Sequence, residues 1–237
     1  RLRSRGLGDV YKRQFLSLFR AATSLSLVIA YQHIASGVAS TIHFMYPLAV
    51  ALAMMCFFRE KGSVWVFAAI GMSIVGAVLL SLGNVDFTRG NTTLGMVSAA
   101  VSVVSYGGYI VGVRKSRAVG IDSTVLTCYV MGLGALYFIA GGLVTGGIRI
   151  ETDGTAWLCI LGVALPATAV SNMTLVQAIK RIGPTLTSVF GALEPLTAVV
   201  IGVAVFGEPF TVQGAAGILL IVAAVTIVIL HSGRRKA

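Results

Sequence analysis

Charged residues are scarce in this chain. Lysine, arginine, aspartate and glutamate make up 11% of its 237 residues, whereas an average soluble domain has about 25%. Hydrophobic residues make up 57%, and the mean hydropathy is +0.92. They fall into runs of about 20 residues, the length with which a helix spans the hydrocarbon layer of a bilayer. The composition therefore excludes an ordinary soluble domain and predicts an integral membrane protein in contact with a lipid bilayer.

Motifs for metal or nucleotide chemistry are also lacking. The three cysteines lie in separate apolar runs without C-x-x-C spacing, which argues against a zinc site and a disulfide framework. We expect these thiols, Cys56, Cys128 and Cys159, to pack in the core. The histidines form no H-E-x-x-H motif, and there is no glycine-rich phosphate-binding loop. We therefore predict a protein that is not an enzyme and has no cofactor and no metal.

Basic residues outnumber acidic ones and give a net charge of +10. They stand in short clusters between apolar runs rather than on one polar face, so we expect no nucleic-acid partner. Because cytoplasmic loops retain lysine and arginine, their distribution indicates orientation. Of the 18 basic residues, all but Arg89 and Arg149 fall on one side when alternate loops are counted. We expect both chain ends in the cytoplasm and the protein in the bacterial cytoplasmic (inner) membrane.

The hydrophobic runs predict eight membrane-spanning helices. Residues 1–14 differ from the rest of the chain, because they are basic and lack apolar periodicity, and we interpret them as a non-native or disordered segment. Residues 232–237 are expected to form a basic cytoplasmic tail. The predicted spans are 15–32, 35–58, 64–82, 94–113, 125–145, 157–179, 185–206 and 212–230.

An internal repeat relates the second predicted span to the seventh. A shift of 148 residues places Pro47 on Pro195 and Glu60 on Glu208, with six identities in thirty aligned pairs. The two copies have opposite orientations by the count of basic residues, as in an inverted-topology repeat. The second repeat, 92–231, has five spans, while the first, 15–86, has three. We therefore predict an all-α polytopic membrane protein with eight transmembrane helices, the remnant of a ten-helix inverted five-helix repeat.

Two sequence modules carry a family resemblance. One is G-V-A-S-T-I-H-F-M-Y-P-L followed by R-E-K, and the other is T-S-V-F-G-A-L-E-P-L followed by F-G-E-P. As a pair they resemble the drug/metabolite transporter superfamily, in its EamA-like branch, and the similarity covers residues 15–230. The resemblance implies a ten-helix inverted repeat with cytoplasmic ends that moves small metabolites by alternating access.

Glu194 stands at the centre of the seventh predicted span, directly before Pro195. A charge at that depth is unfavourable by about 2.5 to 3.5 kcal/mol on insertion scales, so a buried acid there indicates a functional site. Proline also removes a helix hydrogen bond and exposes a backbone carbonyl. The repeat pairs Glu194 with Tyr46 and Gly191 with His43, and we expect these residues to meet at a binding site near the membrane midplane.

The predicted substrate-binding residues are His43, Tyr46, Tyr106, Asn172, Gly191 and Glu194. Four of them have two interpretations. Glu194 either couples a proton or binds a polar part of the substrate, or it is protonated and joins neighbouring helices. His43 is either a proton relay or substrate donor, or a neutral ring bonded to a helix carbonyl. Tyr106 and Asn172 either line a cavity or form interhelical hydrogen bonds.

The sequence thus predicts a secondary active transporter of a small organic metabolite or drug-like solute, with proton coupling as an option. A lipid-head-group flippase and a non-transporting membrane assembly subunit are the alternatives. A homodimer is left open, because the small-residue motifs Gly108-x-x-x-Gly112 and Ala198-x-x-x-Gly202 suit helix packing within one chain equally well.

Overall fold

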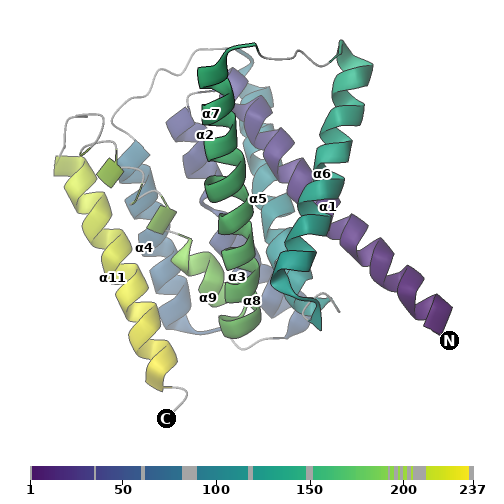
Figure 1. Ribbon diagram of the computed structural model, residues 1–237. Helices are drawn as coiled ribbons and strands as arrows, with labels where there is room; N and C mark the ends of the chain where they lie inside the picture. The colour runs from purple at the N-terminus through teal and green to yellow at the C-terminus, as the bar shows by residue number, and fades with distance from the viewer. Residues whose placement is uncertain are drawn as a thin grey trace. The chain divides into compact units, whose positions relative to one another are not determined.

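The computed structural model describes the protein as an assembly of helices (Figure 1). It describes all residues except 1, 35, 60–61, 82–89, 117–119, 148–151, 192, 195–196, 198–199, 202–203, 205–211 and 235–237. Within those limits the secondary structure consists of helices joined by turns and bends, and the part described contains no β-strand. The helices are α1 (Leu2–His33), α2 (Ser36–His43), α3 (Tyr46–Phe58), α4 (Val64–Ser81), α5 (Thr92–Lys115), α6 (Ser123–Thr145), α7 (Gly154–Gly162), the π-helix η2 (Val163–Val170), α8 (Ser171–Ile182), α9 (Pro184–Phe190) and α11 (Val212–Arg234).

Five helical segments are long and apolar enough to span a membrane, counted over the described residues. They are Gln14–His33, Val38–Phe58, Thr92–Lys115, Ser123–Val144 and Gly154–Ile182. Two shorter apolar helices, Val64–Leu79 and Val212–Ile227, occupy two more of the predicted positions. The remaining predicted span, 185–206, begins with α9 and continues into residues that lie partly outside the description. The prediction of a helical membrane protein is confirmed, while the count of eight stays a prediction.

Helix α1 begins at Leu2, so it includes most of the segment that the sequence sets apart as 1–14. The second predicted span is interrupted. Residues Phe44 and Met45 form a turn between α2 and α3, and Pro47 is the second residue of α3. Proline is tolerated there because the first turn of a helix has no intrahelical partner for its N–H groups.

The chain forms two compact units, whose boundaries fall inside α1, inside α5 and after the first residue of α9. Unit 1 comprises residues 1–22 and 109–184, and unit 2 comprises residues 23–108 and 185–237. Unit 2 therefore takes segments from both predicted repeats.

In unit 2, α4 and α11 lie side by side (Figure 1). A Cβ on Gly76 of α4 would lie 2.7 Å from a side-chain carbon of Ile221 and 2.8 Å from the carbonyl oxygen of Gly217, both on α11. The missing side chain thus allows the two backbones to approach closely, as small residues do between membrane helices. Helices α3 and α9 join them in a core of buried apolar residues, Ala51, Ala69, Ile70, Val189 and Ala224.

In unit 1, α1 and α5 approach at Gly112, where a Cβ would lie 2.7 Å from a methyl carbon of Leu16. Helices α6 and α7 begin at aspartate caps. The Asp122 carboxylate accepts hydrogen bonds from the backbone N–H groups of Thr124 and Val125, and Asp153 caps α7 in the same way. A side-chain acceptor at this position stabilises the first turn.

The three cysteines do not lie in the core. Cys56, Cys128 and Cys159 are all exposed, so the prediction of buried thiols is wrong. Because a membrane-spanning helix is apolar on the face toward lipid as well as on the face toward the protein, hydrophobicity alone does not identify its buried side.

Candidate functional site

Three of the predicted site residues form an aromatic cluster in unit 2. His43 is the last residue of α2, Tyr46 is the first of α3, and Tyr106 lies on α5. The ring centroids of Tyr46 and Tyr106 are 4.7 Å apart, with the rings nearly perpendicular at 81°. The His43 ring lies 5.5 Å from Tyr46 and 5.3 Å from Tyr106. These separations are within the range in which aromatic rings attract one another.

The interruption between α2 and α3 builds this cluster. In a continuous helix, residues 43 and 46 would both face the same side one turn apart; here the turn at Phe44–Met45 separates them, yet both rings still meet Tyr106. His43 is also held from α5, because its Nδ1 and the Ser102 hydroxyl are 2.9 Å apart. Ser102 is fully buried and donates to the carbonyl of Ala99 at 2.6 Å. The hydroxyl is therefore placed to accept from Nδ1, the ring nitrogen that then carries the proton.

Gly191 and Tyr46 are in close contact. Tyr46 is 3% exposed, and a Cβ added to Gly191 would lie 1.7 Å from its hydroxyl oxygen. Glycine is therefore required at this position for the Tyr46 side chain to occupy its site. Gly191 forms the turn directly after α9, as Phe44 and Met45 form the turn after α2.

Glu194 lies beyond this turn. Its backbone N–H donates to the carbonyl of Gly191 at 3.0 Å, and its carboxylate is near enough to Tyr46 to interact electrostatically. Its side chain is exposed, so the prediction that Glu194 is buried among the helices is wrong. Glu194 follows the turn at Gly191 and therefore does not belong to α9.

Asn172 belongs to the other unit. It lies on α8 and is 3% exposed, and its side-chain oxygen accepts a hydrogen bond from the Tyr109 hydroxyl at 3.3 Å. Sequence reasoning selected Tyr106 as the site tyrosine of α5, but Tyr109 is the fully buried one of the two. The spacing of the two tyrosines in the sequence does not show which one is buried, because that depends on the neighbouring helix α8, where Asn172 lies.

The aromatic cluster offers stacking surfaces, two hydroxyl groups, an imidazole and, at its side, a carboxylate. Such a set suits a small organic solute with an apolar or aromatic body and a polar or cationic part. Among the described residues, no three histidine, cysteine, aspartate or glutamate side chains are grouped closely enough to hold a metal ion.

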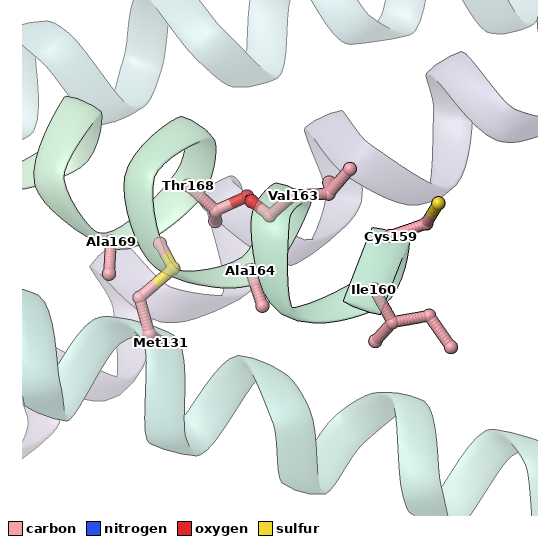
Figure 2. Close-up of a pocket in the computed structure, with 7 residues that line it drawn as sticks. All are labelled: Met131, Cys159, Ile160, Val163, Ala164, Thr168 and Ala169. Carbon is pink, nitrogen blue, oxygen red and sulfur yellow. The ribbon is translucent and has the colours of Figure 1, made fainter. Parts of the chain in front are cut away.

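A cavity of about 620 Å³ lies elsewhere, in unit 1. Figure 2 shows it between α6, which contributes Met131, and the segment α7–η2. The lining is apolar except for Thr168, whose hydroxyl donates to the carbonyl of Val163 at 2.8 Å. The residues that line it, Met131, Cys159, Ile160, Val163, Ala164, Thr168 and Ala169, include none of the predicted site residues.

Sequence reasoning missed this feature, although Pro166 could have signalled it. Pro166 lies inside η2, at the middle of the sixth predicted span. A proline in a helix interior has no N–H to donate and its ring clashes with the preceding turn. Here the chain widens into a π-helix of eight residues; π-helical turns are rare and are frequent at functional sites.

Comparisons with known proteins agree with this architecture. The sequence profile of the EamA-like transporter family matches residues 93–230, which is more than half of the chain. An uncharacterized transporter of Archaeoglobus fulgidus is 24% identical over 212 residues, covering 90% of this chain and 74% of that protein. A solved structure described as a crystal structure of a protein has a TM-score of 0.77 at 17% identity and covers 97% of this chain and 78% of its own, which shows a shared fold. The chain belongs to the EamA-like transporter family and is a membrane transporter protein, as the resemblance to the drug/metabolite transporter superfamily indicated.

Proposed function

We propose that this protein is a secondary active transporter that moves a small organic solute across the cytoplasmic membrane by alternating access, coupled to protons. The observation that carries the proposal is the position of the aromatic cluster at two interrupted helices. His43 and Tyr46 flank the turn between α2 and α3, and Gly191 forms the turn after α9. Discontinuous helices at membrane depth are typical of the binding sites of secondary transporters.

Helix positions support the inverted repeat. Helix α2 ends at His43 and α9 ends at Phe190, and a turn follows each of them, so the two interruptions lie within one residue of a separation of 148 residues. This is the offset that aligns the two copies in the sequence. We propose on this basis that the chain has eight spans arranged as part of a ten-helix inverted repeat, with both ends cytoplasmic in a bacterial inner membrane.

In the proposed mechanism the solute stacks against the half-buried Tyr106, whose ring packs on the buried Tyr46, and Glu194 exchanges a proton. Glu194, which is exposed beside the interrupted helix, takes up a proton from one side of the membrane and releases it to the other as the binding site alternates. His43, fixed through Ser102, supplies a second polar contact to the solute. Membership in a transporter family favours this function over catalysis.

The experiment uses the protein reconstituted in lipid vesicles. The vesicles are loaded with a defined mixture of metabolites, a pH gradient is imposed, and the contents are measured by mass spectrometry. At least one solute should move in response to the gradient, and Glu194→Gln should reduce that movement tenfold or more. Thr226→Val is the matched control, because the Thr226 hydroxyl bonds only within its own helix, to the carbonyl of Val222 at 2.8 Å.

Two outcomes contradict parts of the proposal. If solute movement is the same with and without the pH gradient, and is unchanged by Glu194→Gln, the proton-coupling part of the proposal is contradicted. If no solute of the mixture moves in either direction, the transport proposal fails in this form.

A lipid-head-group flippase is the second candidate, and the apolar cavity beside η2 favours it. Its lining residues on α7 and η2, such as Ile160 and Val163, are exposed on the outside of their helices, where an acyl chain could lie. Transfer of a fluorescent lipid between leaflets, reduced by Ala164→Trp but unaffected by Glu194→Gln, would favour the flippase. A homodimer stays a prediction.

A further inference from the structure

A second polar cluster lies in unit 1, where three helices meet. Tyr109 of α5 is fully buried, and its hydroxyl donates to the side-chain oxygen of Asn172 on α8 at 3.3 Å. Helices α1 and α5 are in contact at Leu16 and Gly112. Arg20 lies one turn from Leu16 on the same face of α1, and Tyr109 lies one turn from Gly112 on the same face of α5, so the two side chains belong to the same helix junction and interact electrostatically. The Nε atom of Arg20 is buried, although the residue as a whole is half-buried. Each helix thus contributes one polar side chain to the same place.

The cluster lies inside the membrane-spanning region. At a rise of about 1.5 Å per residue, Tyr109 is about 8 Å along α5 from Arg114, and Asn172 is about 12 Å along α8 from Lys180. Arg20 lies within the span Gln14–His33, although the orientation count placed it with the loop residues. An ionisable side chain at such depth is a functional-site hypothesis by default.

Asn172 has an unused donor. Its Nδ2 atom is buried and has no hydrogen-bond partner within the described part of the chain, while its oxygen accepts from Tyr109. Asn172 is 97% buried, since 3% of it is exposed. An unsatisfied buried donor is unfavourable unless a ligand supplies the acceptor. A hydrogen bond between helices accounts for the burial of the Asn172 oxygen, but it leaves the buried amide nitrogen without an acceptor.

The hydrogen-bond donors of Arg20 and Asn172 favour an anionic ligand. A guanidinium group has only donors, and the free end of the Asn172 amide is also a donor. The membrane-spanning parts of unit 1 contain no aspartate or glutamate, so the charge that this unit presents there is positive. A planar carboxylate accepts two parallel hydrogen bonds from a guanidinium group and has further lone pairs for a neighbouring amide.

We propose that Arg20 and Asn172 bind the carboxylate of a small organic acid, with Tyr109 as the residue that orients the Asn172 amide. This rests on the proposed function, because it assigns a substrate class to the transporter. The carboxylate accepts from the Arg20 guanidinium and from Asn172 Nδ2, and the Tyr109 hydroxyl keeps the Asn172 oxygen turned away from the anion.

Binding is measured on the full chain in lipid nanodiscs by titration calorimetry at pH 8. The probes are acids and their amides, matched in shape: acetate and acetamide, hexanoate and hexanamide, benzoate and benzamide. At least one acid should bind tenfold more tightly than its amide. Arg20→Gln should weaken that acid at least tenfold and leave the amide unchanged, while Arg20→Lys should weaken it less. Arg181→Gln is the control, because it removes an exposed charge from the same unit.

The proposal is overturned if no acid binds more tightly than its amide, or if Arg20→Gln keeps the preference. If circular dichroism and gel filtration show that Arg20→Gln does not fold, the Asn172→Asp variant tests the proposal in its place. It places a negative charge beside the ligand and should weaken the acid at least tenfold; an unchanged affinity contradicts the proposal.

The vesicle experiment separates this inference from the proposed function. If an acid binds through Arg20 but no solute moves across the membrane, the carboxylate site stands and the transport proposal fails. If only neutral or cationic solutes move and Arg20→Gln has no effect, transport stands and the carboxylate site fails.

Discussion

The two polar clusters differ in how the backbone builds them. In unit 2, His43 and Tyr46 stand at the ends of short helices, and the turn between them makes room for the aromatic rings. In unit 1, Tyr109 and Asn172 project from helices that are unbroken at those positions, and only a hydrogen bond joins them. Interrupted helices release backbone groups that can rearrange, whereas continuous helices hold side chains at a fixed register. We infer that the unit 2 cluster suits a site that changes shape and the unit 1 cluster a site that selects charge.

The close contacts of the two units differ as well. Gly191 faces the hydroxyl of the buried Tyr46, and Gly76 faces backbone of α11. Gly112 of unit 1 faces only the flexible end of Leu16. Unit 2 should therefore be the less tolerant of added atoms.

The largest effect is expected for Gly191→Ala. Its new methyl group would lie 1.7 Å from the Tyr46 hydroxyl, so the tyrosine must leave its buried site. We expect a loss of about 3 kcal/mol in the free energy of unfolding, measured by circular dichroism during titration with sodium dodecyl sulfate. Adding Tyr46→Phe removes the clashing oxygen and should recover at least half of the loss.

Gly107→Ala is the matched control in the same unit. A Cβ there would meet its nearest atom, a carbon of Ala49, at 3.6 Å, which is ordinary contact, and alanine favours the helix. Equal losses for Gly191→Ala and Gly107→Ala, or no recovery with Tyr46→Phe, would contradict the contact between Gly191 and Tyr46.

Gly76→Ala and Gly112→Ala test the difference between the units directly. At Gly76 the added methyl group meets the Gly217 carbonyl at 2.8 Å, and backbone cannot move aside without shifting α11. We expect a loss of about 2 kcal/mol. At Gly112 the side chain of Leu16 can rotate away, so the loss should be below about 1 kcal/mol. The same titration measures both, and a larger loss at Gly112 would reverse the comparison.

Much of this architecture could be predicted from the sequence, because lipid imposes a length and a polarity on each span. The helical membrane class and the apolar segments followed from those constraints, whereas the family followed from the resemblance of two sequence modules. Tyr46 and Gly191 were expected to meet other site residues near the membrane midplane, because the 148-residue repeat pairs Tyr46 with Glu194 and Gly191 with His43.

The sequence could not predict which face of each helix is covered. Glu194 was expected to be buried and is exposed, and Cys128 was expected in the core and lies on the surface. In a membrane protein both faces are apolar, so burial depends on neighbouring helices. The pairing of Tyr109 with Asn172 depends in the same way on the packing of α5 against α8. Pro166 signals an irregularity in its helix, but proline chemistry alone does not predict that the chain there forms a π-helix.

Removing a single hydrogen bond should lower the free energy of unfolding by a similar amount in the two clusters, and by less than the substitution of Gly191 or Gly76. Ser102→Ala removes the partner of His43 Nδ1, and Tyr109→Phe removes the donor to Asn172. Each should lower the free energy of unfolding by about 1 kcal/mol. They should separate functionally: Tyr109→Phe should reduce the preference for acids over amides, while Ser102→Ala should leave it unchanged. An effect of Ser102→Ala on that preference would contradict the separate roles of the clusters.

The smallest effect concerns how helices begin in the two units. Helix α6 of unit 1 begins at Asp122, and hydrogen bonds from the backbone N–H groups of Thr124 and Val125 hold the pKa of this carboxyl below its ordinary value. Helix α3 of unit 2 begins at Met45 without a side-chain cap. A carboxyl whose pKa is lowered by folding stabilises the folded state above its unfolded pKa of about 3.9, and this stabilisation is lost as the pH falls through the folded pKa. Asp122→Asn keeps an acceptor but cannot titrate, so its unfolding midpoint should fall slightly less than that of the unaltered protein between about pH 5 and pH 3. Parallel pH curves for the two proteins would show that the cap charge makes no difference to the start of α6.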